Sequence, residues 1–429
     1  MNYSETLTYL YEQLPMFQRV GSAAFKKDLT NIRELLAVLG NPETKFASIH
    51  VGGTNGKGSV THLLGAALQA GGYKTGLYTS PHYKDFRERI KINGEYVSRK
   101  FVVDFVDRIQ PELARISPSF FEITVAMAFQ YFAEQKVDIA VVEVGLGGRL
   151  DSTNVLKPEL AVITNISYDH QQFLGDTLPE IAGEKAGIIK AGIPVVIGET
   201  QQATAQVFRD KAREVDAPLV FADQLFQVKQ LKQDFSYSYF DVRRQHQPYT
   251  SELLVNLHGP YQQLNIQTAL AALEVWQMHQ TERFLPFSAI QEGWANLRDM
   301  TRFQGRWQVL SEQPRVMVDS AHNEGGLKAI MDQLNAVPGQ LHIVMGVVND
   351  KKLDDVLPLF PKTAKYYFAK ADIPRGLPAE DLQQTAALFD LKGRTYTSVR
   401  NALKAAKRAA STEDTIFVGG SIFTVAEVL

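Results

Sequence analysis

Cysteine is absent from all 429 residues of the sequence. Disulfide bonds, thiol nucleophiles and thiolate metal sites are therefore excluded together. Any metal ion must be held by oxygen and imidazole ligands, a set that favours hard ions such as Mg²⁺.

A large excess of either charge and a long apolar run are also missing. Lys and Arg total 45, Asp and Glu total 47, and the net charge of -2 gives no general attraction to nucleic acid or to an anionic membrane. No segment approaches the roughly 18 apolar residues of a membrane span, and the start, MNYSETLTYLYEQL, has early acidic residues in place of a basic leader. We therefore expect a cytoplasmic enzyme with small-molecule partners.

The pattern of apolar segments predicts an α/β fold. Short apolar runs such as FASIHV, VDIAVVEVG and LAVITNI alternate with amphipathic segments, as in βαβ units on a mostly parallel sheet. Alternating aromatic segments between Leu225 and Leu257 predict appended antiparallel strands. We expect a P-loop mononucleotide-binding domain over residues 1–298 and a smaller Rossmann-like domain over residues 299–429, with the boundary near Leu297 to Met300.

The stretch HVGGTNGKGSVTHLL, residues 50–64, predicts an anion site although it departs from the common phosphate-loop pattern. Val51 and Gly58 stand where that pattern has a glycine and a hydroxyl residue. Between a strand and a helix, however, unpaired N–H groups and the positive end of the helix dipole face one point. The alternative is a glycine-rich turn that only connects the two elements. The residues expected around a phosphate are Thr54, Asn55, Gly56, Lys57, Gly58 and Ser59.

Several segments together resemble one family. GTNGKGS and VVEVGLGGRLDSTNV are similar to the two signature segments of the folylpolyglutamate synthases and dihydrofolate synthases, ATP-dependent ligases related to the Mur ligases of cell-wall synthesis. LYTSP, DHQQFLG, EKAGIIK, QQLN, QGR and DSAHN follow in the family's order along nearly the whole chain.

Two polar residues at strand ends are candidate metal ligands. Glu143 ends an apolar strand, where an ionised carboxylate is costly unless it is paired or bound to metal, and His170 follows the next apolar strand. A hydrogen-bonded core carboxylate and a structural histidine are the alternatives. The resemblance implies that Glu143, His170 and Ser80 are similar to Mg²⁺ ligands and that Ser59 serves the ion beside the ATP phosphates, so that two ions are expected.

Lys185, in GEKAGIIK, reads from the sequence alone as an ordinary surface lysine. The resemblance implies a different role, because the matching lysine of the family is carbamylated by CO₂. The adduct replaces a cation by an anion, so that a group that would repel Mg²⁺ becomes able to support it.

The resemblance also implies ATP contacts from the second domain. Asp319, His322 and Asn323 follow the strand in RVMVDSAHN, and Asn265 and Arg306 lie in QQLN and QGR. The alternatives are a hydrogen-bonded turn without a ligand and, for Arg306, a salt bridge at the domain junction. The family's pattern places ATP in a cleft between the domains.

The folate-binding residues are expected in two segments. SFFEI resembles a pterin-site segment, with Phe121 for stacking and Glu122 for hydrogen bonding, although an aromatic beside a carboxylate is also common at a helix start. Asp151, Ser152 and Thr153 close the second signature and are expected to face the pterin.

The resemblance implies that the chain adds L-glutamate to a folate-type carboxylate through an acyl phosphate. The acceptor is tetrahydrofolate, dihydropteroate or both, and the protein is expected to be a monomer. One alternative is a Mur-type ligase for a cell-wall precursor, although the loop begins early enough to leave little room for the separate N-terminal domain those enzymes use. Another is a P-loop nucleotide sensor without ligase activity. The expected catalytic set is Lys57, Glu143, His170, Lys185 and Arg306.

Overall fold

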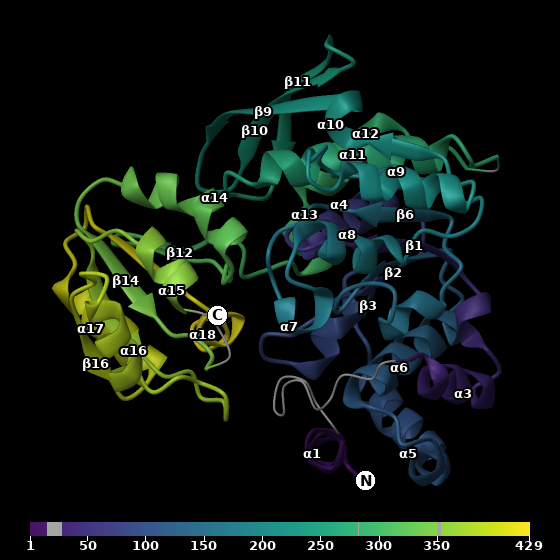
Figure 1. The fold of residues 1–429 in the computed structure, drawn as a ribbon, viewed down its shortest axis with the longest axis horizontal. Coiled ribbons are helices and arrows are strands. Elements are labelled where there is room, and N and C mark those ends of the chain that lie inside the picture. The colour runs from purple at the N-terminus through teal and green to yellow at the C-terminus, as the bar shows by residue number, and fades with distance from the viewer. Residues whose placement is uncertain (15–27, 282, 350–352) are drawn as a thin grey trace. The chain divides into compact units, whose positions relative to one another are not determined.

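The computed structural model describes residues 1–14, 28–281, 283–349 and 353–429, and Figure 1 shows the fold. The described chain divides into two compact units. Unit 1 comprises Met1–Lys232, Tyr239–Asn256 and Gln263–Phe303, and unit 2 comprises Gln233–Ser238, Leu257–Gln262 and Gln304–Leu429.

Unit 1 contains an eight-stranded sheet in the order β4-β3-β2-β5-β1-β6-β7-β8. The run from β2 to β8 is parallel, and β3 and β4 add an antiparallel edge next to β2. The strands are β1 (Ala47–Gly52), β2 (Thr75–Tyr78), β3 (Ile90–Ile92), β4 (Glu95–Tyr96), β5 (Ile139–Glu143), β6 (Leu160–Ile163), β7 (Val195–Ile197) and β8 (Leu219–Phe221).

Helices cover both faces of this sheet. The helices of unit 1 in the described ranges are α1 (Tyr3–Gln13), α3 (Thr30–Val38), α4 (Lys57–Ala70), α5 (Arg99–Ile116), α6 (Phe120–Glu134), α7 (Gln171–Leu174), α8 (Leu178–Ala186), α9 (Ala205–Glu214), α10 (Ala222–Leu225), α11 (Gln262–Gln277), α12 (Phe287–Ala295) and α13 (Leu297–Thr301). All of α11 except its first residue belongs to unit 1. Short 3₁₀ turns cover Pro42–Thr44, Phe86–Arg89 and Ser152–Val155.

Strand register decides which side chains face α4. Leu77 pairs with Val141, and side chains two residues apart on a strand point the same way, so Leu77, Val141 and Glu143 share one face. Helix α4 packs on that face so closely that a methyl group added at Gly65 would collide with Leu77. The last residue of β5 therefore points toward the helix that follows the glycine-rich loop.

The opposite face buries two apolar clusters. Tyr78 and Val142 pack with Phe105 of α5 and Phe129 of α6 in the first cluster. Further along the sheet, residues of β6 and β7 pack with α8 and α9 in the second. Burial on both faces explains why the central strands read as nearly continuous apolar runs.

A separate three-stranded sheet follows β8 in the chain, in the order β11-β10-β9. Its strands are β9 (Phe226–Gln233), β10 (Ser238–Arg244) and β11 (Gln247–Val255). Strands were expected in this region from its alternating pattern, and the structure contains them.

Unit 2 contains a six-stranded sheet in the order β12-β13-β17-β14-β15-β16, parallel except for the pair β12 and β13. Residues of α14 and α16 pack with β13, β14, β15 and β17 in one apolar cluster, and α17 contacts β14 and β15. The strands are β12 (Gln308–Glu312), β13 (Arg315–Val318), β14 (Leu341–Met345), β15 (Lys365–Ala369), β16 (Gly393–Tyr396) and β17 (Thr415–Gly419). The helices are α14 (Glu324–Asn335), α15 (Leu353–Val356), α16 (Ala379–Ala387), α17 (Val399–Ala409) and α18 (Ile422–Ala426), with a 3₁₀ turn at Leu357–Leu359.

The predicted α/β fold class is confirmed, with a glycine-rich loop between β1 and α4 in unit 1 and a smaller α/β unit after it. No helix in the described ranges is both long and apolar enough to cross a membrane.

Candidate active site

The loop between β1 and α4 has a backbone that requires glycine. Gly53 and Gly56 have φ angles of 132° and 85°, which L side chains rarely adopt. A methyl group at Gly56 would also collide with the side-chain oxygen of Asn265, and one at Gly53 would collide with Thr164. Asn265, predicted from QQLN as an ATP contact, is therefore placed against the loop by the structure.

Polar residues beyond the end of β6 fix the conformation of this loop. The backbone N–H of Asn55 donates to Asn165 Oδ1 at 3.0 Å, and Thr164 Oγ1 donates to the carbonyl of Asn55 at 2.5 Å. Thr54 Oγ1 accepts from the N–H of Ser167 at 3.0 Å. Thr164, Asn165 and Ser167 were not predicted, although the polar ending of the apolar run in LAVITNIS was a usable signal.

Two lysine side chains converge on one carbonyl of the loop. Lys57 Nζ donates to the carbonyls of Gly53 and Thr54, each at 3.0 Å. Lys185 Nζ, from the last turn of α8, donates to the same Gly53 carbonyl at 3.0 Å. Burial, and then the charge of Lys57, lower the pKa of Lys185 to about 7. Lys185 is thus buried against the glycine-rich loop, which corrects its reading as a surface lysine.

The carboxylate of Glu143 lies beside the first turn of α4. A methyl group at Gly58 would lie 3.8 Å from both of its oxygens, and Oε2 accepts from the backbone N–H of Ser80 at 3.1 Å. The hydroxyl of Ser59, one residue further along α4, is buried without a hydrogen-bond partner among the described residues. A buried carboxylate and an unsatisfied hydroxyl at one helix turn form a donor set that fits a hard divalent cation.

His170 lies in the segment that follows β6. It has a φ of 50°, is partly exposed, and its Nε2 lies 3.8 Å from Oδ1 of Asp169. The charge of Asp169 raises the pKa of Lys185 against the lowering caused by burial, so the charge of this segment acts on Lys185. Within the described ranges, no group of three or more His, Asp or Glu side chains is arranged to hold a metal ion. The complete ligand set predicted for Mg²⁺ therefore stays a prediction.

Asp151 organises the turn that closes the second signature. Its carboxylate accepts from the N–H of Leu146 at 2.8 Å and from the N–H and hydroxyl of Thr153 at 3.0 and 2.5 Å. Burial raises the pKa of Asp151 although these hydrogen bonds act in the opposite direction. Ser152 begins the same 3₁₀ turn, and Thr153 also contacts Nε2 of His50 at 2.8 Å.

The predicted pterin residues Phe121 and Glu122 lie in the first turn of α6. Glu122 Oε2 accepts from the N–H and hydroxyl of Ser119 at 2.7 and 2.8 Å, which forms a helix capping box. Phe121 packs against Gly145, where an added methyl group would collide with its ring. The capping role of Glu122 could have been inferred from the spacing of Ser119 and Glu122.

Asp319 of unit 2 is occupied by structural hydrogen bonds. Oδ2 accepts from the hydroxyl of Tyr261 and from the N–H of Trp307 at 2.8 Å, and Oδ1 accepts from the N–H of Ala321 at 2.7 Å. The carboxylate thus fixes the turn after β13. This is the alternative role expected from the sequence, a hydrogen-bonded turn without a ligand.

Three other predicted residues lie around this turn. The guanidinium of Arg306 donates to the hydroxyl of Ser320, and Nδ1 of His322 contacts the carbonyl of Ser320 at 2.9 Å. Asn323 caps α14 by accepting from the N–H of Gly326. The structure therefore brings Arg306, Asp319 and His322 together within unit 2, and their ATP contacts stay predictions.

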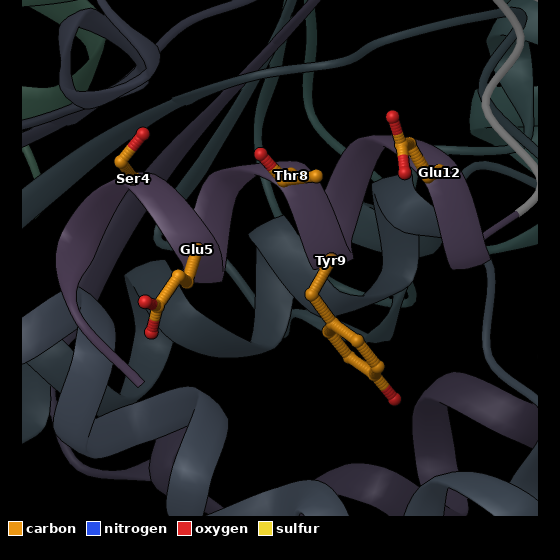
Figure 2. A pocket seen from close by; sticks show the side chains of 5 residues that line it. All are labelled: Ser4, Glu5, Thr8, Tyr9 and Glu12. Atoms are coloured by element: carbon orange, nitrogen blue, oxygen red, sulfur yellow. The ribbon is translucent and has the colours of Figure 1, made fainter.

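A surface pocket of about 400 Å³ lies along α1. Figure 2 shows the residues that line it, which all belong to this helix and include none of the predicted site residues: Ser4, Glu5, Thr8, Tyr9 and Glu12. The pocket is therefore separate from the candidate site.

Two family models match the chain in succession. The Mur ligase middle domain matches residues 51–273, and the Mur ligase glutamate ligase domain matches residues 305–422. The first match includes the loop, Glu143 and Lys185. Together with the fold, these matches place the protein in the Mur ligase superfamily.

Curated relatives narrow this class. The dihydrofolate synthase/folylpolyglutamate synthase of Bacillus subtilis is 32% identical over 94% of each chain. The folylpolyglutamate synthase of Lacticaseibacillus casei is 34% identical over 100% of this chain and 98% of its own length. The chain belongs to the folylpolyglutamate synthase and dihydrofolate synthase family.

Solved structures agree with this assignment. Escherichia coli FolC, in complex with DHPP and ADP, matches with a TM-score of 0.85 and 30% identity, covering 100% of this chain and 97% of that one. The bifunctional enzyme of Yersinia pestis, complexed with AMPPNP and a manganese ion, matches with a TM-score of 0.84 and 31% identity over the same shares.

Proposed function

We propose that the chain is an ATP-dependent ligase that forms an amide between L-glutamate and the carboxylate of a folate-type acceptor. The observation that carries the proposal is the convergence of Lys57 and Lys185 on the Gly53 carbonyl, next to a helix start that Glu143 adjoins. The ammonium group of Lys57 and a row of backbone N–H groups at one point suit the phosphates of ATP. The folate ligases among the relatives support the acceptor class.

The reaction requires two displacements. An acceptor carboxylate oxygen attacks the γ-phosphorus of ATP, the bond to the bridging oxygen breaks, and ADP leaves. The amine of glutamate then attacks the acyl carbon, phosphate leaves with the electron pair of the C–O bond, and the amine loses a proton. Lys57 holds the transferring phosphoryl group, and Arg306 is proposed as a second, permanently charged donor.

A bound divalent cation supplies charge neutralisation at the phosphate oxygens. We propose that Ser59 and Glu143 hold it beside the first turn of α4, and that Ser80 and His170 contribute to a second Mg²⁺ ion. The buried, unsatisfied hydroxyl of Ser59 supports the first position.

A carbamate on Lys185 is the proposed modification. Formation of a carbamate needs a neutral amine, and burial beside Lys57 lowers the pKa of Lys185 to about 7, so both forms of the amine are present near neutral pH. The product is an anion beside Lys57, which replaces a repulsion between two cations by an attraction.

The remaining roles are proposed on the resemblance and on position. Phe121, Glu122, Asp151, Ser152 and Thr153 are proposed to contact the pterin. The nucleotide contacts are proposed to be Thr54, Asn55, Gly56, Lys57, Gly58, Ser59, Asn265, Arg306, Asp319 and His322.

We assign residues 1–298 to the ATPase and folate-binding domain and residues 299–429 to the C-terminal ligase domain. Matches of the two family models to residues 51–273 and 305–422 support this assignment. A cytoplasmic location and a monomeric state stay predictions.

The test is a comparison of acceptors. Purified protein with ATP, Mg²⁺ and glutamate is offered dihydropteroate, tetrahydrofolate and a nucleotide-linked cell-wall precursor in turn, and phosphate release is measured. We expect glutamate-dependent release with dihydropteroate, tetrahydrofolate or both. Release only with the cell-wall precursor would favour the Mur-type alternative, and release that ignores glutamate and all acceptors would favour a nucleotide sensor.

A further inference from the structure

A buried lysine lies between the sheet and α4 without an assigned role. Lys91 pairs with Leu77 across β2 and β3, and Leu77 faces α4, so the register turns Lys91 toward the same helix. Its side chain is buried, with 3% of its surface exposed. Burial of an ammonium group costs free energy, and an apolar residue would fill this space without that cost.

The ammonium group of Lys91 joins two segments of unit 1. Nζ donates to the carbonyl of Thr301, the last residue of α13, at 2.9 Å. It also lies 2.9 Å from Nε2 of His62 on α4. The ring of His62 packs against Phe303, with 4.7 Å between ring centroids.

His62 extends this chain of hydrogen bonds to the phosphate loop. Its Nδ1 lies 2.7 Å from the carbonyl of Gly58, which can only accept, so Nδ1 carries the proton. Nε2 of the neutral ring is then an acceptor for Lys91. Gly58 lies between Lys57 and Ser59, so the chain ends at the turn that the proposed function assigns to the phosphates and the cation.

The charge of Lys91 also acts at this turn. Burial lowers the pKa of Lys91 to about 8, while the charges of Glu88 and Glu143 raise it. The ammonium form therefore persists at neutral pH and attracts the Glu143 carboxylate that lies against Gly58.

We propose that Lys91 and His62 are positioning residues for the nucleotide phosphates, acting through the Gly58 carbonyl on the first turn of α4. Neither residue is proposed to touch ATP. The inference rests on the proposed function only in taking this turn as the phosphate site. Loss of the hydrogen bonds that link Lys91, His62 and Gly58 weakens nucleotide binding. The backbone N–H groups of the first turn of α4 and the hydroxyl of Ser59 are then no longer held in one arrangement.

The test compares Lys91→Met with Lys100→Met, an exposed lysine on α5 that is paired with Asp104. Equilibrium binding of ADP with Mg²⁺ is measured by calorimetry on protein whose folding is checked by thermal unfolding. We expect Lys91→Met to raise the dissociation constant by roughly ten-fold, the range seen when groups that orient ligands are removed, and Lys100→Met to leave it unchanged. KM for ATP should rise with it, while KM for glutamate should not.

The double variant Lys91→Met/His62→Phe keeps the test decisive if a single variant folds poorly, because it fills the site with two apolar side chains. Both changes break the same series of hydrogen bonds. The loss of ADP affinity in the double variant should therefore match the loss in Lys91→Met and should not be the sum of the losses in the two single variants. Wild-type ADP affinity in the folded double variant, or an equal rise of KM for all three substrates, would overturn the proposal. Because ADP binding is measured without turnover, the result stands even if the protein shows no folate-dependent activity.

Discussion

The arrangement of charges around Gly53 is the basis for expecting an anion at this loop. Lys57 and Lys185 donate to the same carbonyl, so their positive charges repel each other in a largely buried place. Either a phosphate group or a carbamate on Lys185 relieves that repulsion. Both lysines are therefore expected to matter more for activity than for stability.

Replacement of Lys57 by alanine tests its role as the cation that holds the transferring phosphoryl group. We expect turnover to fall at least about 100-fold, as when a charge-stabilising donor is removed, because the phosphoryl group loses its cation. Steady-state phosphate release is the measurement, and thermal unfolding should show an intact fold. Lys100→Ala is the control, and activity of Lys57→Ala near that of this control would show that the loop is not the catalytic phosphate site.

Replacement of Lys185 by alanine tests the carbamate. Activity should fall roughly 10- to 100-fold, the range for groups that support a metal site, and short carboxylates added to the assay should restore part of it. Mass spectrometry without acid treatment should detect the added CO₂ on the wild-type protein. Full activity of Lys185→Ala would contradict the role, and a loss that no carboxylate restores would argue against an anion at this position.

At the scale of residues, GTNGKGS and the end of an apolar strand carried the signal for Lys57 and Glu143. The structure places the carboxylate of Glu143 beside Gly58, the residue after Lys57, while the roles of both residues stay predictions. Lys91 was missed, because its contacts join segments far apart in the chain and leave no local pattern. Thr164 and Asn165 were also missed, although the polar ending of LAVITNIS was a signal for them. The burial of Lys185 was not predictable from its local sequence either, because it depends on how α8 packs against the loop.

At the scale of elements, the turn from β1 into α4 depends on space as well as on backbone conformation. Gly56 and Gly72 have nearly equal φ angles of 85° and 83°, but only a side chain at Gly56 would collide, in its case with Asn265. Substitutions at the two glycines therefore distinguish the effect of backbone strain from the effect of a disrupted loop.

Gly56→Ala and Gly72→Ala form a matched pair. Each should lose about 1 kcal/mol of unfolding free energy from left-handed strain, but only Gly56→Ala should also weaken ATP binding. Chemical unfolding and KM for ATP are the measurements. Equal KM values for the two variants would show that the contact with Asn265 does not shape the nucleotide site.

His50, on β1, makes the unfolding free energy of the protein depend on pH. Burial, and then the charge of Lys190, lower the pKa of His50 to about 3 in the folded protein, so only the unfolded chain takes up the proton as the pH falls below about 6.5. The folded state therefore loses stability at acidic pH. Between pH 7 and pH 5 the wild type should lose about 2 kcal/mol more than His50→Gln.

Urea unfolding at the two pH values measures this difference. His246→Gln, at an exposed position, is the control and should follow the wild type. If His50→Gln shows the same loss as the wild type, the acid sensitivity belongs to other groups.

The long buried elements could be predicted from the sequence because their periodicity is clear. β1, β5 and β6 were recognised as apolar runs, and α4 as the helix after the glycine-rich loop. β3, β4 and α13 were not predicted, because they are five residues or shorter and contain charged side chains. Their positions depend on contacts such as that between Lys91 and Thr301.

For the whole molecule, the fold and the family are shown, and the choice of acceptor stays a prediction. A bifunctional relative and a folylpolyglutamate synthase match at 32% and 34% identity over nearly the whole chain, so overall similarity does not separate the two activities. We expect that choice to depend on the segments around Phe121 and Asp151, where the structure shows a helix start and a tight turn. Small changes there alter an acceptor site without altering the fold.

The central claim, formation of an acyl phosphate on a folate-type carboxylate, is tested most directly by isotope transfer. The preferred acceptor is labelled with heavy oxygen in the carboxylate that receives glutamate, and the protein is supplied with ATP, Mg²⁺ and glutamate. We predict that each amide formed releases one phosphate that carries one heavy oxygen from the acceptor, since that oxygen becomes the bridge of the acyl phosphate. Glutamylated product with unlabelled phosphate would contradict the mechanism, and the absence of glutamylated product from every folate-type acceptor would contradict the function.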